Sequence, residues 1–231
     1  MSGERPDPDR GVFETLLLRD GRLHALGEHL SRLERSLRDL YGSPLPPATR
    51  AHLLGRLAAA ASRASGERRV RVDVVPGSGG ELGVTIVVSD PPSRRGVVLE
   101  PVVVPGGLGP HKWRDRRLVD RPAGQPVPLI LDADDSVLEA AWANVWVLDG
   151  DALTTPPADG RVLPGVTRGR LLELAPALGL TAREAPLSLA QVRAAPILFL
   201  TSALRLAVPA GLGRRPPPSP PVDRIRDALG E

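Results

Sequence analysis

Lys112 is the only lysine in the chain, and its chemistry sets it apart from the other cationic side chains. The 231-residue sequence contains 30 Lys+Arg, so all the others of these two types are arginines. A guanidinium holds phosphates and carboxylates well but keeps its proton. An amine whose pKa is lowered by burial or by a neighbouring cation can instead attack an aldehyde and form a Schiff base. Lys112 is therefore a candidate reactive amine, and an ordinary surface lysine is the alternative interpretation.

A carboxylate and an amide stand out in the apolar run from Val137 to Val147. Glu139 and Asn144 are its only hydrogen-bonding side chains apart from the indoles. An unpaired carboxylate is costly to bury, so Glu139 needs a partner such as a protonated ring nitrogen. The alternative is a glutamate at a strand edge that faces water.

Three further positions carry a hydroxyl or a cationic side chain. Thr167 follows Pro164-Gly165-Val166 at the predicted start of a helix, where backbone N–H groups and a hydroxyl bind phosphate well. Ser202 ends an apolar strand, and Arg32 lies beside a leucine stripe. An ordinary threonine cap and a solvated helix arginine are the alternatives for Thr167 and Arg32.

The elements that position these residues follow from periodicity and turn signals. Leucines at 26, 30, 33, 37 and 40 form one stripe of an amphipathic helix that ends at Gly42, and Pro46-Pro47 opens a second helix. Alternating or apolar runs predict strands, with an Asp20-Gly21 turn after the first. The predicted strands cover residues 11–18, 69–75, 84–88, 97–104, 127–131 and 197–200. Residues 105–110 form the best candidate linker, and residues 214–221 form a stiff proline-rich spacer before a short last helix.

Composition excludes several classes of function. There is no cysteine for disulfides or thiolate metal sites, and the four histidines lack a metal-ligand spacing, so we expect no metal. The sequence pI is about 10.3, but the net charge is only +3 and aromatic residues are few, which argues against nucleic-acid binding. No stretch resembles a signal peptide or a membrane span, so we expect a cytoplasmic protein that does not act at a membrane.

Taken in order, these motifs resemble the class IV aminotransferase family. The series comprises Gly-x-Phe-Glu-Thr, His-Leu-x-Arg-Leu, the lone lysine after a linker, Val-Leu-Glu-x(4)-Asn-x-Trp, Leu-Thr-Thr-Pro and Leu-Pro-Gly-Val-Thr-Arg. The resemblance covers roughly residues 11 to 210. These are fold type IV enzymes that use pyridoxal 5′-phosphate.

The resemblance implies a role for each of these residues. Lys112 would form the Schiff base with the cofactor aldehyde and act as the general base. Glu139 would pair with the protonated pyridine nitrogen, and Asn144 would belong to the cofactor site. The remaining cofactor-binding residues would hold the phosphate: Arg32, Val166, Thr167 and Ser202.

Within the family, the sequence resembles the aminodeoxychorismate lyases most. Arg71 lies on the predicted strand that leads into Gly77-Ser78-Gly79-Gly80. In these lyases a basic residue at the position of Arg71 is associated with the substrate carboxylate, and Thr15 matches a threonine on the substrate side. The implied reaction converts 4-amino-4-deoxychorismate into 4-aminobenzoate and pyruvate, a step of folate biosynthesis. Glu81 replaces an arginine usual in the lyases, which removes one cationic anchor.

Two other functions stay open. An aminotransferase acting on a small branched-chain or D-amino acid is the first, although Arg117 stands where branched-chain enzymes carry a tyrosine. A non-catalytic relative of the fold is the second.

The expected architecture is a two-lobed mixed α/β protein. We predict a small N-terminal α/β domain over residues 1–104 and a larger, barrel-like cofactor-binding domain over residues 105–231. The resemblance also implies a homodimer and a small-molecule substrate.

Overall fold

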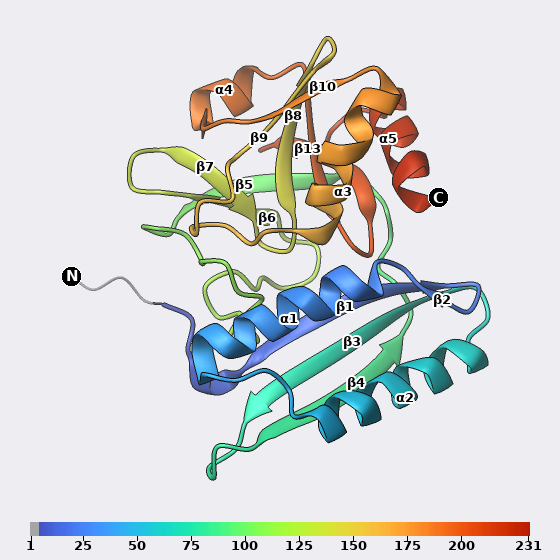
Figure 1. The fold of residues 1–231 in the computed structure, drawn as a ribbon. Helices are drawn as coiled ribbons and strands as arrows, with labels where there is room; N and C mark the ends of the chain where they lie inside the picture. Colours follow the sequence, from blue (N-terminus) through green and yellow to red (C-terminus); the bar gives the residue numbers. More distant parts are fainter. Residues whose placement is uncertain (1–4) are drawn as a thin grey trace. The chain divides into compact units, whose positions relative to one another are not determined.

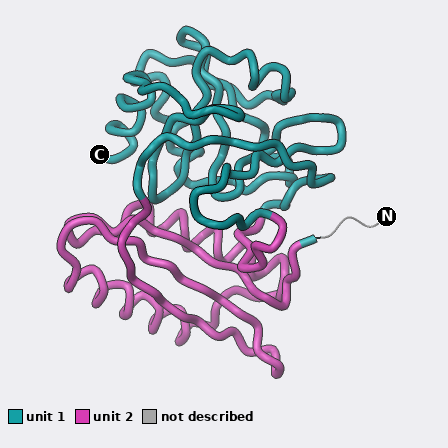
Figure 2. Tube along the Cα trace, turned by 180° about the vertical axis from the view of Figure 1, so that it is seen from behind, with its two compact units in different colours: residues 1–5, 93–110, 119–231 teal, residues 6–92, 111–118 magenta. Residues whose placement is uncertain are grey.

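The chain forms two compact units that are interleaved in sequence. A computed structural model describes residues 5–231; Met1 to Glu4, the start of the segment judged to lack a signal peptide, lie outside the described residues. Unit 2 comprises Pro6–Pro92 and His111–Leu118, and unit 1 comprises Ser93–Pro110 and Val119–Glu231 together with Arg5 (Figure 2). The sequence predicted a division between residues 104 and 105, and the bounds of the compact units are different. Ser93–Pro110 belongs to unit 1, and the eight residues His111–Leu118 belong to unit 2.

Unit 2 is a four-stranded sheet with two helices on one face (Figure 1). The strand order is β2-β1-β3-β4, and every pair is antiparallel. Its elements are η1 (Pro8–Arg10), β1 (Val12–Arg19), β2 (Arg22–Leu23), α1 (Leu26–Tyr41), α2 (Pro47–Arg63), β3 (Glu67–Pro76) and β4 (Leu82–Ser89).

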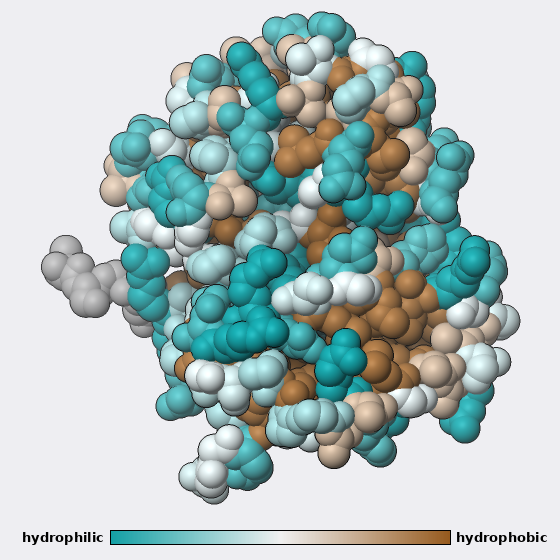
Figure 3. Space-filling view, viewed as in Figure 1, coloured by the Kyte–Doolittle hydropathy of each residue, from teal (hydrophilic) through white to brown (hydrophobic). Residues whose placement is uncertain are grey.

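The alternation of side chains along β1 and β3 separates a core face from a polar face. Leu16, Val70 and Val72 are buried in one cluster with the helix residues Leu33 and Leu37, as expected for an amphipathic helix on a sheet. Apolar side chains, drawn brown, show at the surface between α1 and α2 in Figure 3.

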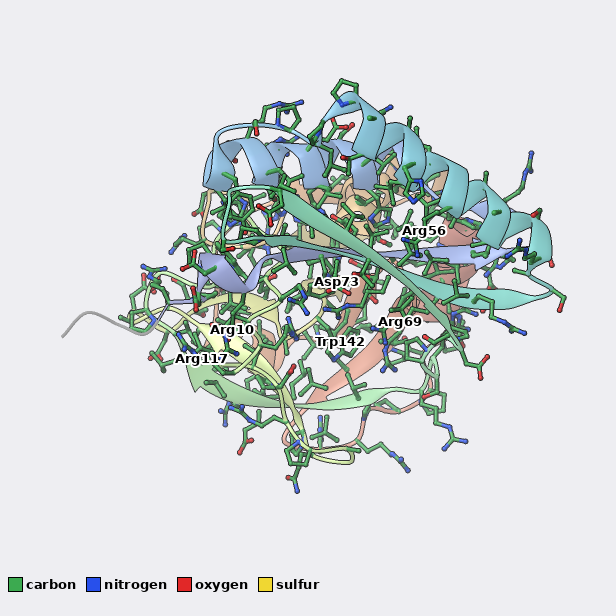
Figure 4. The ribbon with its side chains drawn as sticks, turned by 90° about the horizontal axis from the view of Figure 1, so that it is seen from below. Arg10, Arg56, Arg69, Asp73, Arg117 and Trp142 are labelled. Carbon is green, nitrogen blue, oxygen red and sulfur yellow. The ribbon has the colours of Figure 1, made fainter. Side chains whose placement is uncertain are left out.

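The opposite face of this sheet carries the polar side chains. The register pairs Thr15 with Arg71 and Phe13 with Asp73, so these side chains share one face. Figure 4 shows Arg69 and Asp73 on the side of β3 away from the helices. The predicted shared face of Arg69, Arg71 and Asp73 is confirmed.

The predicted turn and helix end of unit 2 are also confirmed. Asp20 and Gly21 both have positive φ, at 50° and 74°, which is the conformation of a two-residue hairpin turn. Gly42 ends α1 in the left-handed conformation, where its N–H donates to the Arg38 carbonyl.

Unit 1 is built on a nine-stranded sheet in the order β10-β9-β8-β12-β13-β5-β6-β7-β11. Its strands are β5 (Val97–Val103), β6 (Val127–Leu131), β7 (Ser136–Ala140), β8 (Asn144–Asp149), β9 (Ala152–Thr155), β10 (Thr181–Glu184), β11 (Leu187–Ser188), β12 (Ile197–Ser202) and β13 (Leu206–Leu212). Its helices are α3 (Val166–Leu174), η2 (Ala175–Leu178), α4 (Leu189–Ala194) and α5 (Pro220–Gly230).

The sheet of unit 1 curls back on itself. A short turn joins β7 to β8, and Ala140 and Ala143 exchange backbone hydrogen bonds there (2.8 and 3.1 Å). Because four strands lie between β8 and β7 in the sheet order, this turn brings the two ends of a six-strand run together. The barrel-like lobe expected from the sequence is therefore present, and α3 and α5 pack against β12 and β13.

The mixed α/β class is confirmed. Within residues 5–231, no helix is both long enough and apolar enough to cross a lipid bilayer.

Candidate active site

Backbone contacts attach the Lys112 segment to the first strand of unit 2. The N–H of Phe13 donates to the carbonyl of Lys112 (2.8 Å), and the N–H of Arg114 donates to the carbonyl of Gly11 (3.0 Å). Trp113 forms an antiparallel bridge with Val12 and packs on the apolar cluster of the unit. The lysine therefore occupies a fixed position beside the start of β1.

The ammonium of Lys112 lies on the polar face of the sheet. Its Nζ is 4.9 Å from the centre of the Phe13 ring, and the guanidinium of Arg71 is 3.8 Å from the same ring. Both cations are thus attracted to one aromatic ring, and Thr15 pairs with Arg71 in the adjacent register. Of the predicted residues, unit 2 therefore places Lys112, Arg71 and Thr15 at one end of β1.

The guanidinium of Arg71, predicted to bind a substrate carboxylate, is already held by an acid. Its Nε and Nη2 donate to Asp73 at 2.7 to 3.0 Å, and Arg114 Nε donates to the same carboxylate at 2.8 Å. Burial alone would raise the pKa of Asp73, but these arginines lower it. Much of the charge of Arg71 is therefore balanced within unit 2.

Arg32, predicted to hold the phosphate, lies in a buried group of three charged or titratable residues. Its Nε and Nη2 each donate to Glu14 at 2.7 Å, and the Nδ1 of His29 lies 2.8 Å from the same carboxylate. Burial would raise the pKa of Glu14, but the charge of Arg32 and the hydrogen bonds from His29 and Arg32 lower it to about 2. The alternative of a solvated helix arginine is wrong, because Arg32 is 7% exposed. Glu14 orients the guanidinium, and the phosphate role stays a prediction.

In unit 1, Glu139 and Asn144 contact the same residue from two strands. The Leu163 N–H donates weakly to both carboxylate oxygens of Glu139 (3.4 Å), and Asn144 Nδ2 donates to the Leu163 carbonyl (2.9 Å). Glu139 is 5% exposed, so the alternative of a water-facing glutamate is wrong. Leu163 thereby fixes the loop before α3 relative to the buried acid.

The start of α3 has the features of an anion site. Gly165 is the N-cap, and no side chain caps the helix, so its first N–H groups lack intrahelical partners. A Cβ at Gly165 would collide with the Asn144 side chain, which explains why glycine lies there. Val166 and Thr167 supply the first backbone donors and a buried hydroxyl. These residues fit a phosphate group.

Arg168 holds the first turn of α3 in place. Its Nη2 donates to the Pro156 carbonyl (2.8 Å) and forms an ion pair with Glu184 of β10. The side chain is 5% exposed, and its Nε has no hydrogen-bond partner in the structure. The sequence motif contains Arg168, but nothing in the motif indicated this anchoring role.

The two hydroxyls at the end of β12 have different environments. Thr201 is 1% exposed and accepts a hydrogen bond from Trp146 Nε1 (2.9 Å), so it belongs to the packing of the sheet. Ser202 is partly buried, and its Oγ accepts a weak hydrogen bond from the Arg205 N–H (3.4 Å). Its own O–H stays available to donate, as a phosphate ligand requires.

The linker that precedes Lys112 is anchored to the loop before α3. The Asp132 carboxylate accepts from the Gly106 N–H (2.8 Å) and from Arg161 (2.9 Å), and the Gly109 N–H donates to the Arg161 carbonyl (3.1 Å). Gly107 has φ of +68°, and a Cβ there would collide with the Arg161 carbonyl. Only glycine fits this close approach.

The predicted site residues therefore fall into two groups, one in each unit. Lys112, Arg32, Arg71 and Thr15 lie in unit 2, and the other group, Glu139, Asn144, Val166, Thr167 and Ser202, lies in unit 1.

Sequence reasoning missed three contributors. Leu163 acts through its backbone, which leaves no signal in the sequence. Glu14 was visible within the Phe-Glu-Thr motif but received no role. Arg168 was likewise quoted only as part of a motif.

Comparison with known proteins gives matches over part of the sequence. A model of the family described as amino-transferase class IV matches residues 116–211. Branched-chain-amino-acid aminotransferase 6 of Arabidopsis thaliana is 35% identical over 81 residues, which are 34% of this chain and 23% of that protein. A putative branched-chain-amino-acid aminotransferase of Methanocaldococcus jannaschii is 32% identical over 87 residues, or 38% of this chain and 30% of that protein. The matched segments thus span less than a third of these curated relatives.

Solved structures match over nearly the whole chain. A fold IV-transaminase from Curtobacterium pusillum has a TM-score of 0.81 at 26% identity, covering 95% of this chain and 82% of that one. A hypothetical aminotransferase from Mycobacterium tuberculosis in its PLP-bound form has a TM-score of 0.82 at 24% identity, covering 96% and 88%. A putative 4-amino-4-deoxychorismate lyase from Legionella pneumophila has a TM-score of 0.81 at 21% identity, covering 100% and 95%.

The cofactor named for the Mycobacterium tuberculosis structure is the one that the motifs predict. The resemblance expected from the motifs is therefore confirmed: this chain has the fold of the class IV aminotransferases, and its residues 116–211 match that family.

Proposed function

We propose that this chain is a pyridoxal-phosphate-dependent lyase that converts 4-amino-4-deoxychorismate into 4-aminobenzoate and pyruvate. The observation that carries the proposal is the placement of the only lysine. Lys112 is fixed beside β1 and shares the Phe13 ring with Arg71, so the one side-chain amine of the sequence, a potential nucleophile, has a fixed place on the polar face of unit 2.

The donor set of each unit fits a different part of the cofactor. In unit 1, the buried Glu139 would hold a protonated ring nitrogen, and the uncapped start of α3 with Thr167 and Ser202 would hold the phosphate. In unit 2, Lys112 would hold the aldehyde carbon, and Arg32, oriented by Glu14, would add a second phosphate ligand. When bound, the cofactor supplies an electron sink for negative charge on the substrate carbon that bears the amino group.

The residues of this chain then carry out proton transfer and positioning. The Lys112 amine takes the proton from the carbon that bears the amino group of the substrate. The bond between the neighbouring ring carbon and the ether oxygen breaks, and enolpyruvate leaves with the electron pair on that oxygen. Protonation of its CH2 carbon then gives pyruvate. The ring becomes aromatic, and all atoms of the substrate are found in the two products.

The experiment uses the fact that the chain has one lysine. The purified protein is incubated with pyridoxal phosphate, reduced with borohydride and digested, and the masses of the peptides are measured by mass spectrometry. We expect one pyridoxyl group on the peptide that contains Lys112, and neither this group nor the visible absorbance of the bound cofactor in Lys112→Ala. Labelling only of the N-terminal amine would reject the cofactor role of Lys112.

The substrate is tested separately with the loaded enzyme. Release of 4-aminobenzoate and pyruvate in equal amounts, without an added keto acid, supports the lyase. An amino acid that converts the cofactor to its amine form, with activity restored by a keto acid, supports the second candidate, an aminotransferase. That candidate is favoured by the curated branched-chain aminotransferases among the sequence relatives. Loss of both activities in a protein that still binds the cofactor would point to the third candidate, a non-catalytic relative.

The resemblance also supports a cytoplasmic homodimer as part of this proposal. Light scattering on the eluting peak of a sizing column checks the oligomeric state: a mass of about twice 24.5 kDa is expected, and a mass of one chain would contradict it.

A further inference from the structure

Arg205 differs from Arg32, Arg71, Arg161 and Arg168, because no acid of residues 5–231 accompanies it. Arg32, Arg71, Arg161 and Arg168 each pair with an aspartate or glutamate. Arg205 is partly buried, and no carboxylate of the described residues lies within ion-pair distance of it. A cation withdrawn from water without an anionic partner is unfavourable, so this position suggests that an anion from outside the chain completes it.

The contacts of Arg205 keep its guanidinium in place. One end, Nη1, donates to the carbonyl of Ser93, and the planar group lies 4.5 Å from the centre of the Trp142 ring. Within residues 5–231, no hydrogen bond occupies Nε or Nη2, the edge that a carboxylate uses for paired hydrogen bonds. Burial lowers the pKa of Arg205, yet an arginine remains charged in a protein at neutral pH.

The backbone places Arg205 next to Ser202 of the proposed cofactor site in the same unit. The backbone N–H of Arg205 donates to Ser202 Oγ (3.4 Å). Arg205 is the last residue of the tight turn between β12 and β13, and Leu206, which follows it, has a φ of +57°. Trp142 lies in the turn that follows Glu139 on β7. The cation and the indole therefore stand at the ends of two strands that also carry predicted cofactor ligands.

We propose that Arg205 and Trp142 form a binding subsite for the carboxylate of an unsaturated ring acid, the substrate class of this enzyme. The guanidinium would bind the carboxylate, and the flat indole would pack against the adjacent ring. The inference rests on the proposed lyase function and deepens it. It supplies the cationic anchor that the sequence loses at Glu81, and it assigns to Arg205 the role predicted for Arg71, whose charge Asp73 balances.

Binding of simple probes to the cofactor-loaded protein tests the subsite without turnover. Benzoate carries the carboxylate and the ring, and benzamide is its neutral counterpart; calorimetry measures both. We expect Arg205→Gln to weaken benzoate binding by about tenfold to a hundredfold, as loss of a charged hydrogen bond does, and to leave benzamide binding unchanged. Arg205→Lys should recover part of the loss, and Trp142→Ala should weaken both probes.

Steady-state kinetics give a second readout. Arg205→Gln should raise KM for 4-amino-4-deoxychorismate by a similar factor and change kcat by less than about threefold. The visible absorbance of the bound cofactor should be unchanged, which shows that the site is intact. Arg193→Gln, an exposed arginine of α4 in the same unit, is the matched control and should behave like the wild type.

The outcomes separate this inference from the function on which it rests. Equal benzoate binding by wild type and Arg205→Gln, no benzoate binding by the wild type, or a larger loss in Arg71→Gln would each overturn the subsite. If Arg205→Gln does not fold, the comparison of Arg205→Lys with the wild type decides, and an unchanged benzoate affinity there overturns it. If the wild type releases no 4-aminobenzoate but still binds benzoate more tightly than Arg205→Gln does, the lyase reaction is rejected and the carboxylate subsite is retained.

Discussion

The buried group of Glu14, His29 and Arg32 gives a prediction whose magnitude follows from the structure. Replacing Glu14 by Gln removes the negative charge between Arg32 and His29 and leaves a buried guanidinium without its acid. The pKa of Glu14 is about 2 against an ordinary value of 4.5. At 1.36 kcal/mol for each unit of difference, the ionised carboxylate stabilises unit 2 by about 3 kcal/mol. A buried ion pair broken on one side costs a similar amount, about 3 to 5 kcal/mol.

The sign of the pH dependence follows from the lowered pKa. Because the folded state binds the proton of Glu14 less tightly than the unfolded state, the stabilisation is complete above about pH 4.5. It is lost as the pH falls from about 4.5 towards 2. The difference between wild type and Glu14→Gln should therefore be largest at pH 7 and smaller at pH 3, because the carboxyl of the unfolded wild-type chain is then protonated and folding has to release that proton.

Hydrogen-exchange mass spectrometry of peptides from α1, in increasing urea, measures this difference at both pH values. Glu34→Gln is the matched control: Glu34 pairs with Arg50 (2.8 Å) and Arg38 (3.5 Å), but both arginines are about half exposed (45% and 54%). An exposed pair of this kind contributes about 0 to 1 kcal/mol. The reasoning is refuted if Glu14→Gln protects α1 as well as the wild type at pH 7, or if its deficit is equally large at both pH values.

Three further predictions concern unit 1. Gly107→Ala should lower the thermal midpoint of unfolding more than Gly109→Ala: both glycines have positive φ, but only the Cβ at 107 collides with the Arg161 carbonyl, and equal shifts would exclude this collision as the cause. Arg168→Met should destabilise the first turn of α3 by about 1 to 3 kcal/mol, because the Pro156 carbonyl loses its donor; hydrogen exchange of α3 would show it, and Arg170→Met should have little effect. Asp132→Asn should increase hydrogen exchange of the linker amides at 106–109, since Asp132 accepts from Gly106 and from Arg161; unchanged protection of these amides would contradict this anchoring role.

The elements were predictable wherever one pattern of the sequence decided the local structure. The leucine stripe and Gly42 predicted α1 and its end, and the Asp20-Gly21 pair predicted the hairpin turn. The apolar run around Glu139 indicated correctly that this acid would be buried. The interaction of Arg71 with Asp73 was also within reach, because residues two apart on a strand share a face.

The partners of the site residues were not predictable, because they depend on packing between distant segments. Arg32 meets Glu14 only once α1 lies on β1, 18 residues away in sequence. Leu163 contributes backbone groups, which every residue has. The return of the Lys112 segment to unit 2 depends on a bridge to Val12, and one short bridge has no compositional signature.

The interleaving of the two units has a consequence for how the protein is made. During synthesis, Pro6–Pro92 leaves the ribosome well before the eight residues 111–118 that complete the same unit. The first sheet must therefore wait, with the place for Trp113 beside Val12 unfilled, until the intervening stretch 93–110 has emerged. Lys112 joins unit 2 only in this last step, so a nascent chain stalled before residue 111 carries Arg32 and Arg71 but lacks the amine that we propose reacts with an aldehyde.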